Sequence, residues 1–126
     1  MEVSQVMNKA FIIDDNVTLK EAAKMMSVKN IGSVLVVKDS KILGIITEKD
    51  VARNLNKLNS KVSSIMSRKV VTIEYDEELE DAATLMAENK IKRLPVMQNK
   101  KLVGIITATD IIAHAKDINE EEFMIN

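Results

Sequence analysis

The chain has 126 residues, 46% of them hydrophobic and 29% charged, and a formal net charge of −1 at pH 7. This balance is typical of a folded globular protein and argues against the broad basic surface of a nucleic-acid binder. The chain has no cysteine, which excludes disulfides, thiolate nucleophiles and thiolate metal sites. No apolar run approaches the roughly 20 residues of a membrane span, and no export signal is visible at the N-terminus, so we expect a cytoplasmic protein.

The first half of the chain predicts five elements in the order β-α-β-β-α. A short strand is expected near residues 11–13. Apolar residues then recur at the spacing of one helix face, at Leu19, Ala22, Ala23 and Met26. Two β-branched runs at 34–37 and 42–46 flank a short polar turn, which predicts a β-hairpin. A helix over 48–57 closes this half.

The second half repeats the first. GIITEKD at Gly44–Asp50 returns as GIITATD at Gly104–Asp110, and TLKEAAKMM returns as ELEDAATLM. VSQVM from Val3 matches VSSIM from Val62, with one residue inserted between the blocks. An internal repeat of this length indicates that one small structural unit occurs twice in the chain. The second copy predicts the same five elements: a strand near 70–73, a helix starting at Leu79, hairpin strands at 94–97 and 102–106, and a helix over 108–116.

The repeat predicts an α+β protein with the organisation 1–60 for the first unit, 61–118 for the second and 119–126 for an acidic tail. A unit of about 60 residues is marginal alone, so we expect the two units to share a core. Gly44 and Gly104 are expected to end the hairpin turns and to permit a close approach or an unusual φ. Pro95 lies in a predicted strand, so it should begin that strand or lie on a sheet edge.

The repeated Thr-x-x-Asp segment supports two interpretations. Thr47 with Asp50, and Thr107 with Asp110, form the capping pattern of a helix N-terminus. The same place also suits an anion, because helix N-termini carry free N–H groups. A carboxylate there can accept hydrogen bonds from both hydroxyls of a ribose. Capping and nucleotide binding therefore both remain open.

The sequence resembles the CBS domain, and specifically the tandem CBS pair or Bateman module. The resemblance spans about residues 3–116 and depends on VSSIM, the ELEDAATLM-type helix, KRLPV, and GIIT-x-x-D in both copies. It implies two βαββα repeats packed about a pseudo-twofold axis, with two clefts between them. Such clefts commonly bind AMP, ADP, ATP or S-adenosylmethionine. It also implies a homodimer formed through the helices, and no required cofactor.

The resemblance assigns roles to particular residues. Asp50 and Asp110 would hold a ribose, with Thr47 and Thr107 close to ribose or phosphate. The residues of the first strands would touch the base: Ile12, Ile13, Thr72 and Ile73. The expected site also includes Lys92, Arg93 and Pro95 of the KRLPV segment, where a basic residue would face phosphates. Arg53, one turn beyond Asp50, could reach a phosphate or could simply lie on a solvated helix face.

The sequence thus predicts a stand-alone regulatory module that senses an adenosine compound and acts through a regulated protein or its own assembly. The alternative is a ligand-free structural or dimerisation module, in which Thr and Asp only cap helices. A nucleic-acid binder is disfavoured by the charge balance and the shortage of aromatic residues. An enzyme is the least favoured class, because one histidine and no cysteine leave no catalytic constellation.

Overall fold

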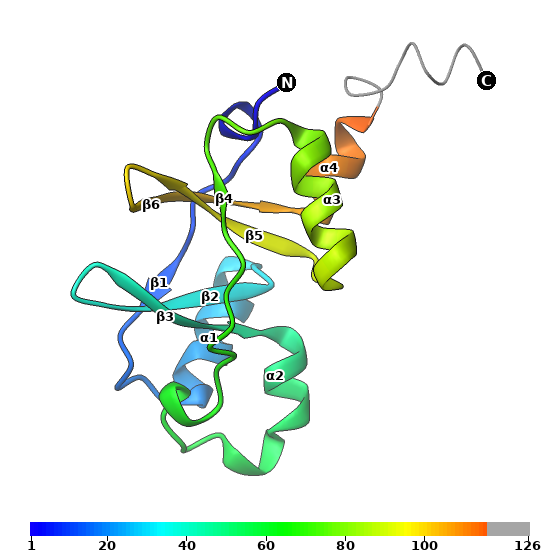
Figure 1. Cartoon of the computed structure of the whole chain (residues 1–126). Helices are drawn as coiled ribbons and strands as arrows, with labels where there is room; N and C mark the ends of the chain where they lie inside the picture. The colour runs from blue at the N-terminus through cyan, green and yellow to red at the C-terminus, as the bar shows by residue number, and fades with distance from the viewer. Residues whose placement is uncertain (116–126) are drawn as a thin grey trace. The chain divides into compact units, whose positions relative to one another are not determined.

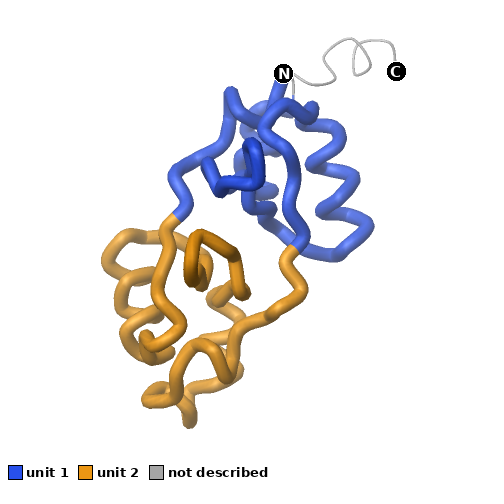
Figure 2. The backbone as a smooth tube through the Cα atoms, turned by 60° about the vertical axis from the view of Figure 1, so that its left-hand side comes forward, with its two compact units in different colours: residues 1–10, 71–126 blue, residues 11–70 orange. Residues whose placement is uncertain are grey.

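A computed structural model describes residues 1–115. The chain folds into two compact units. Unit 2 comprises residues 11–70, whereas unit 1 combines residues 1–10 with the chain from residue 71 onward (Figure 2). The compact units therefore differ from the sequence repeats, because the first ten residues pack with the second repeat. The predicted tail at 119–126 and the predicted end of the last helix lie outside the described residues.

Unit 2 has the predicted order of elements. These are β1 (Ile12–Ile13), α1 (Leu19–Lys29), β2 (Ser33–Lys38), β3 (Lys41–Thr47) and α2 (Glu48–Arg53). The sheet order is β1-β2-β3, with β2 parallel to β1 and antiparallel to β3 (Figure 1). The apolar stripe of α1 is buried against this sheet. Short 3₁₀ turns follow α2, at Leu55–Lys57 and Val62–Ser64.

Unit 1 has the same architecture. After a 3₁₀ turn at Val3–Gln5, its elements are β4 (Ile73–Glu74), α3 (Leu79–Asn89), β5 (Arg93–Gln98), β6 (Lys101–Thr107) and α4 (Ala108–Ala113). The sheet order is β4-β5-β6, with the same parallel and antiparallel pairings as in unit 2. The α+β class and the two βαββα repeats are thus confirmed.

The first closing helix is shorter than predicted. α2 ends at Arg53 instead of residue 57, because the side chain of Asn54 donates a hydrogen bond to the carbonyl of Asp50 at 2.7 Å. The Asn54 N–H bonds to Val51 O, a tighter turn than an α-helix makes. α4 spans Ala108–Ala113, and the predicted end of this helix at residue 116 lies outside the described residues. Within residues 1–115, no helix has the length and apolar character needed to cross a membrane.

Both hairpins turn through two residues with positive φ. These pairs are Asp39 (51°) with Ser40 (64°), and Asn99 (51°) with Lys100 (65°). Positive φ at both central positions defines the type I′ turn, which matches the twist of the flanking strands. The prediction that the glycines end the hairpin turns or adopt an unusual φ is therefore wrong. Gly44 and Gly104 lie inside strands, beside a shift in strand register, and neither has a positive φ.

Close approach is the part of the glycine prediction that is confirmed. A Cβ on Gly104 would lie 2.8 Å from the carbonyl oxygen of Asn8, and one on Gly44 would lie 2.8 Å from that of Ser67. Both contacts come from a segment that runs along the free edge of the hairpin. Asn8 exchanges backbone hydrogen bonds with Ile105 at 2.8 and 2.9 Å, and Ser67 does so with Ile45 at 3.0 Å each. A side chain at either glycine would push that segment off the sheet.

The position of Pro95 was predicted wrongly. Pro95 is the third residue of β5, which is the central strand of its sheet. In unit 2 the equivalent Leu35 donates its N–H to Phe11 O at 2.9 Å, on the side of the short parallel strand. Proline cannot make that bond. The pairing of β4 accordingly begins one residue later, with Ile73 opposite Val96, so the ladder loses only one hydrogen bond.

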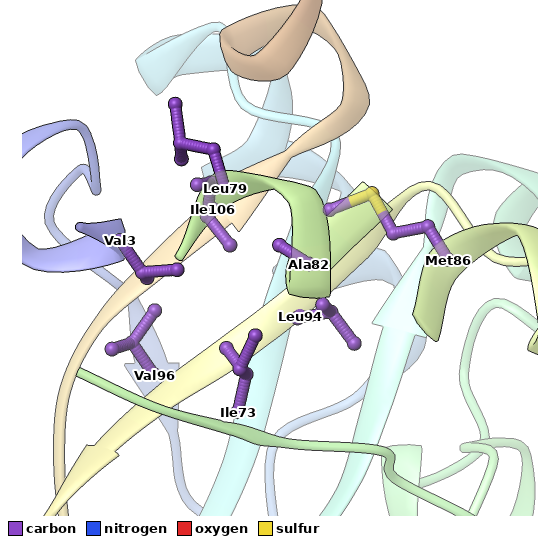
Figure 3. Close-up of a cluster of buried hydrophobic side chains, with 8 residues drawn as sticks. All are labelled: Val3, Ile73, Leu79, Ala82, Met86, Leu94, Val96 and Ile106. Carbon is purple, nitrogen blue, oxygen red and sulfur yellow. The ribbon is translucent and has the colours of Figure 1, made fainter. Parts of the chain in front are cut away.

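The buried side chains form two clusters, one in each unit. The cluster of unit 1 combines one residue of the N-terminal segment with residues of the sheet and of α3 (Figure 3): Val3, Ile73, Leu79, Ala82, Met86, Leu94, Val96 and Ile106. In unit 2, Val62 and Met66 take the place of the N-terminal segment. Each core is thus completed by the segment that precedes the other repeat in sequence.

Lys100→Gly should stabilise the protein. Lys100 has φ of 65°, which costs a residue with a Cβ roughly 1 kcal/mol relative to glycine. Urea denaturation should therefore show an increase of that order in the free energy of unfolding. Lys101→Gly, one residue into β6, is the matched control and should lower it instead. A loss of stability in Lys100→Gly would contradict the type I′ turn.

Candidate functional site

The candidate site is the junction where each hairpin ends and the closing helix begins. In unit 2, Thr47 is the last residue of β3 and the N-cap of α2. Asp50 Oδ2 accepts hydrogen bonds from the Thr47 N–H at 2.8 Å and from Thr47 Oγ1 at 3.2 Å. Both side chains are half-buried. The predicted capping role is therefore real, and it holds the carboxylate at a helix N-terminus.

The junction of unit 1 contains a more complete set of hydrogen bonds. Asp110 Oδ2 accepts from the Thr107 N–H and from Thr107 Oγ1, each at 2.8 Å. Thr107 Oγ1 in turn accepts from the Asp110 N–H at 3.2 Å. This is the reciprocal capping box of a helix N-terminus. It fixes the orientation of the carboxylate before any ligand arrives.

Two cationic residues lie beside the junction of unit 1. Arg93 is the first residue of β5 and pairs directly with Thr107 across the hairpin. The carbonyl of Lys92 accepts the Ala108 N–H at 2.8 Å. Arg93 is half-buried and Lys92 is exposed. The sheet thus brings the backbones of both predicted phosphate-binding residues next to Thr107 and the start of α4.

The equivalent positions in unit 2 carry no charge. Ser33 pairs with Thr47, and Gly32 O accepts the Glu48 N–H at 3.2 Å. The cation predicted for this unit is Arg53, the exposed last residue of α2. The structure places Arg53 on the helix that carries Asp50 but does not bring the two side chains into a hydrogen bond. The two junctions are therefore alike in backbone and different in charge.

The predicted base-contacting residues lie in β1 or at the start of β4, with Thr72 just before β4, and they differ in exposure. Ile73 is only 4% exposed and belongs to the core of unit 1, and Ile13 packs against the core of unit 2. Ile12, in contrast, is 52% exposed, and Thr72 is also exposed. Alternation along a strand puts each exposed residue on the face opposite the core. Only Ile12 and Thr72 thus present side chains that a base could touch, and Ile13 and Ile73 offer backbone groups.

Pro95 is fully buried, so its side chain shapes the strand.

One polar residue at the junction was missed by sequence reasoning. Asn8 donates a hydrogen bond from Nδ2 to Asp110 Oδ2 at 2.8 Å, across 102 positions of sequence. No local pattern could have found this contact, because it depends on the packing of the N-terminal segment against the second repeat.

Comparison with known families agrees with this fold and its duplicated junction. The family model of the CBS domain matches residues 3–57 and 62–117. The chain belongs to the CBS-domain family. It contains two CBS domains, and the two matches cover both Thr-x-x-Asp junctions.

Several curated proteins are similar to this chain in sequence. MJ1232 of Methanocaldococcus jannaschii is 40% identical over 82% of this chain, and the chain spans 36% of that protein's length. A 17.7 kDa protein of Acidianus ambivalens is 33% identical over 97% of this chain and 77% of its own length. The inosine-5′-monophosphate dehydrogenase of Thermoplasma acidophilum is 33% identical over 91% of this chain, which spans only 24% of that enzyme.

Solved CBS structures share the fold. The CBS domain pair of MJ0100, in complex with 5′-methylthioadenosine and S-adenosylmethionine, has a TM-score of 0.86 and 30% identity, over 94% of this chain and 98% of its own. A CBS-domain protein of Agrobacterium tumefaciens has a TM-score of 0.84 and 25% identity, over 91% of this chain and 99% of its own. A CBS pair with this level of identity is thus known to hold adenosine compounds.

Removing the two junction carboxylates should destabilise the CBS repeats unequally. Asp50→Ala removes one cap and should lower the free energy of unfolding by about 1 kcal/mol. Asp110→Ala also removes the acceptor of Asn8 and should lower it further, by about 2 kcal/mol in all. Urea denaturation measures both. If Asp110→Ala were as stable as the wild type, the hydrogen bonds of the capping box would not exist in solution.

Asp81→Ala is the matched control for these two variants. Asp81 accepts the Glu78 N–H at 3.0 Å at the start of α3, where no ligand is expected. It also raises the pKa of Glu77, through a side-chain hydrogen bond and charge repulsion. Its removal relieves that repulsion, so the loss of stability should be smaller than for either junction carboxylate.

Proposed function

We propose that this chain is a regulatory module that binds an adenosine compound: AMP, ADP, ATP or S-adenosylmethionine. The observation that carries the proposal is the pair of helix N-termini at which a carboxylate is held in a fixed orientation by Thr. The adenosine ligands of the MJ0100 CBS pair support the same ligand class. The binding sites of this proposal include the two Thr-x-x-Asp junctions, one in each unit.

The ribose is the group that the junction recognises. The Oδ1 atoms of Asp50 and Asp110 accept none of the capping hydrogen bonds described above, so they can accept hydroxyl donors. Ionised carboxylates make stronger hydrogen bonds than neutral acceptors. The base lies against apolar or small side chains such as Ile12 or Thr72, while backbone groups of Ile13 and Ile73 read its edge. A mostly apolar pocket with a few fixed polar groups is the usual form of a ligand site.

The phosphate groups of a ligand should bind more tightly at the junction of unit 1 than at the junction of unit 2. Arg93 and Lys92 adjoin the N-terminus of α4, whereas unit 2 has Ser33 and Gly32 in the same places. Arginine binds phosphate through two parallel hydrogen bonds. A nucleotide with phosphates should therefore prefer the site of Asp110. The site of Asp50 would rely on Arg53, or would take a ligand with less negative charge.

The module acts by binding, without catalysis of its own. A ligand can shift an assembly or a partner complex only if it binds one state more tightly than the other. The output would therefore be a change in the affinity for a regulated protein or for a second copy of the chain. A cytoplasmic location stays a prediction.

Thermal unfolding of the wild type with AMP, ADP, ATP, S-adenosylmethionine and 5′-methylthioadenosine tests this function. A ligand at 100 times its dissociation constant adds about 2.7 kcal/mol to the free energy of unfolding. The unfolding midpoint should then rise by several degrees. Asp110→Ala should lose the shift caused by a phosphate-bearing ligand, and Asp50→Ala should retain it.

Asp81→Ala controls for lower stability, because it removes a helix-capping carboxylate away from the proposed sites and should keep the full ligand shift. The absence of any shift in folded wild-type protein would contradict the proposal. It would favour the structural alternative, in which Thr107 and Asp110 serve only as caps.

We also propose that the chain forms a homodimer through its helices. Val28 on α1 is 78% exposed and Ile112 on α4 is 74% exposed, although both are large apolar side chains. Light scattering after gel filtration should give twice the chain mass of 14.1 kDa. The double variant Val28→Glu with Ile112→Lys should give the chain mass itself, because charges are poorly tolerated in the core of an interface.

Lys38→Glu, at the exposed end of β2 and outside the helices, is the control for the dimer and should leave its mass unchanged. A wild type that elutes as a monomer at all concentrations would contradict the dimer. It would leave the ligand proposal untouched, since that is tested by thermal unfolding.

A further inference from the structure

The helical faces of the two units carry opposite charge. In unit 2, α2 packs against α1, and in unit 1, α4 packs against α3 (Figure 1). α1 carries three lysines and one glutamate, a net charge of +2, whereas α3 carries three carboxylates and no cation. The glutamate of α1 is Glu21, which accepts a hydrogen bond from Thr18 Oγ1 at 3.0 Å within its own helix cap. The face of unit 2 is therefore basic and that of unit 1 acidic.

The difference in charge lies on one exposed stripe of each helix. Residues four positions apart lie on the same side of a helix. The residues of this stripe, for α1 and then for α3, are Lys20, Lys24 and Val28, and Glu80, Thr84 and Glu88. Within residues 1–115, neither lysine takes part in a salt bridge. Like charges that face each other across an interface are unfavourable. The face of unit 2 is thus complementary to that of unit 1 and not to itself.

The helical face of unit 2 also contains a groove of about 320 Å³. Its apolar lining comes from α1, α2 and the turn after α1: Ala23, Met26, Ile31 and Val51. A single water needs only about 15 Å³ of cavity volume, so this groove has room for a branched apolar side chain.

Unit 1 presents a side chain of this kind. Ile112 on α4 is 74% exposed, although its neighbour Ile111 packs against the core of unit 1. The equivalent residue of α2 is Ala52, which is exposed but too short to enter a groove. The protruding isoleucine and the groove are thus on different units, as are the two signs of charge.

We infer that the proposed homodimer is head-to-tail: the helical face of unit 2 packs against the helical face of unit 1 in a second copy. Ile112 of that copy fills the groove beside Met26, and the carboxylates of its α3 face the lysines of α1. A head-to-head dimer would instead place α1 against α1 and α3 against α3. Because a twofold axis relates the two copies, the head-to-tail contact occurs twice in each dimer. The inference rests on the proposed homodimer and adds its orientation.

Thiol cross-linking distinguishes the two orientations, because the chain has no cysteine of its own. Ser27→Cys places a thiol at the groove, and Ile112→Cys places one on the residue that would fill it. A short bis-maleimide joins nearby thiols without the strict geometry of a disulfide. A mixture of the two variants should give a covalent dimer with one copy of each, identified by mass spectrometry. Each variant alone should remain a single chain in a denaturing gel.

Lys41→Cys, at the exposed start of β3, is the matched control and should give no covalent dimer with either variant. Covalent dimers of Ser27→Cys alone or of Ile112→Cys alone, without the mixed product, would overturn the inference and leave the homodimer intact. A dimer in light scattering that gives no mixed product would do the same. A monomer in light scattering would contradict the homodimer itself, and the inference with it.

Reversal of charge is an independent test of the same orientation. Lys20→Glu with Lys24→Glu makes α1 acidic, and Glu80→Lys with Glu88→Lys makes α3 basic. Each pair should raise the dissociation constant of the dimer by about tenfold, because like charges then face each other. All four changes in one chain should return it to within about threefold of the wild type, since the charges are again opposite. Analytical ultracentrifugation measures these constants.

The control for charge reversal is Lys41→Glu with Lys101→Glu, which changes the net charge as much as the lysine pair does but lies on the hairpins. It should leave the dissociation constant unchanged. Urea denaturation verifies that each variant is folded. A head-to-head dimer predicts no weakening by either pair, so unchanged constants in both pairs would overturn the inference. A chain with all four changes that dimerises no better than either pair would also overturn it.

Discussion

Each unit depends on the close contact between a glycine in its hairpin and a segment from the start of the other sequence repeat. A side chain at Gly104 would meet the backbone of Asn8, and one at Gly44 would meet that of Ser67. Only the missing Cβ lets these segments pair with β6 and β3 and cover their free edges, which would otherwise be open to another strand. The same segments bring Val3 and Val62 into the two cores. Neither sequence copy therefore contains its own complete folding unit.

This exchange also shapes the candidate sites. The segment that covers the edge of β6 ends beside the N-terminus of α4, so one backbone pairing both completes the core and delivers a side chain to Asp110. In the proposed function, the same segment would therefore contribute to both stability and ligand binding. The capping bonds of Thr107 orient the carboxylate in advance, which lowers the entropic cost of binding a ligand. In the proposed function, the helix cap would also serve as the ribose site.

The sequence was informative where the interactions are local. Apolar spacing located α1 and α3, and the repeat predicted the order of elements in both units. Sequence reasoning failed where a distant strand or a single side chain determines the local structure. Pro95 is tolerated in a central strand because its missing N–H would face the place where β4 has yet to begin. Asn54 ends α2 early through its own side chain. The contact of Asn8 with Asp110 spans 102 positions, beyond any local pattern.

The two copies differ mainly where the fold leaves them free to do so. The glycine of the hairpin, the Thr and Asp of the cap and the buried stripe of the first helix recur, because each has a packing or backbone role. Arg93 in place of Ser33, and Asn8 in place of Ser67, alter neither core. Both differences lie beside the junction, one adding positive charge and the other a hydrogen-bond donor. A duplicated fold with unequal junctions favours two sites of different ligand preference, since equal sites would need no such differences.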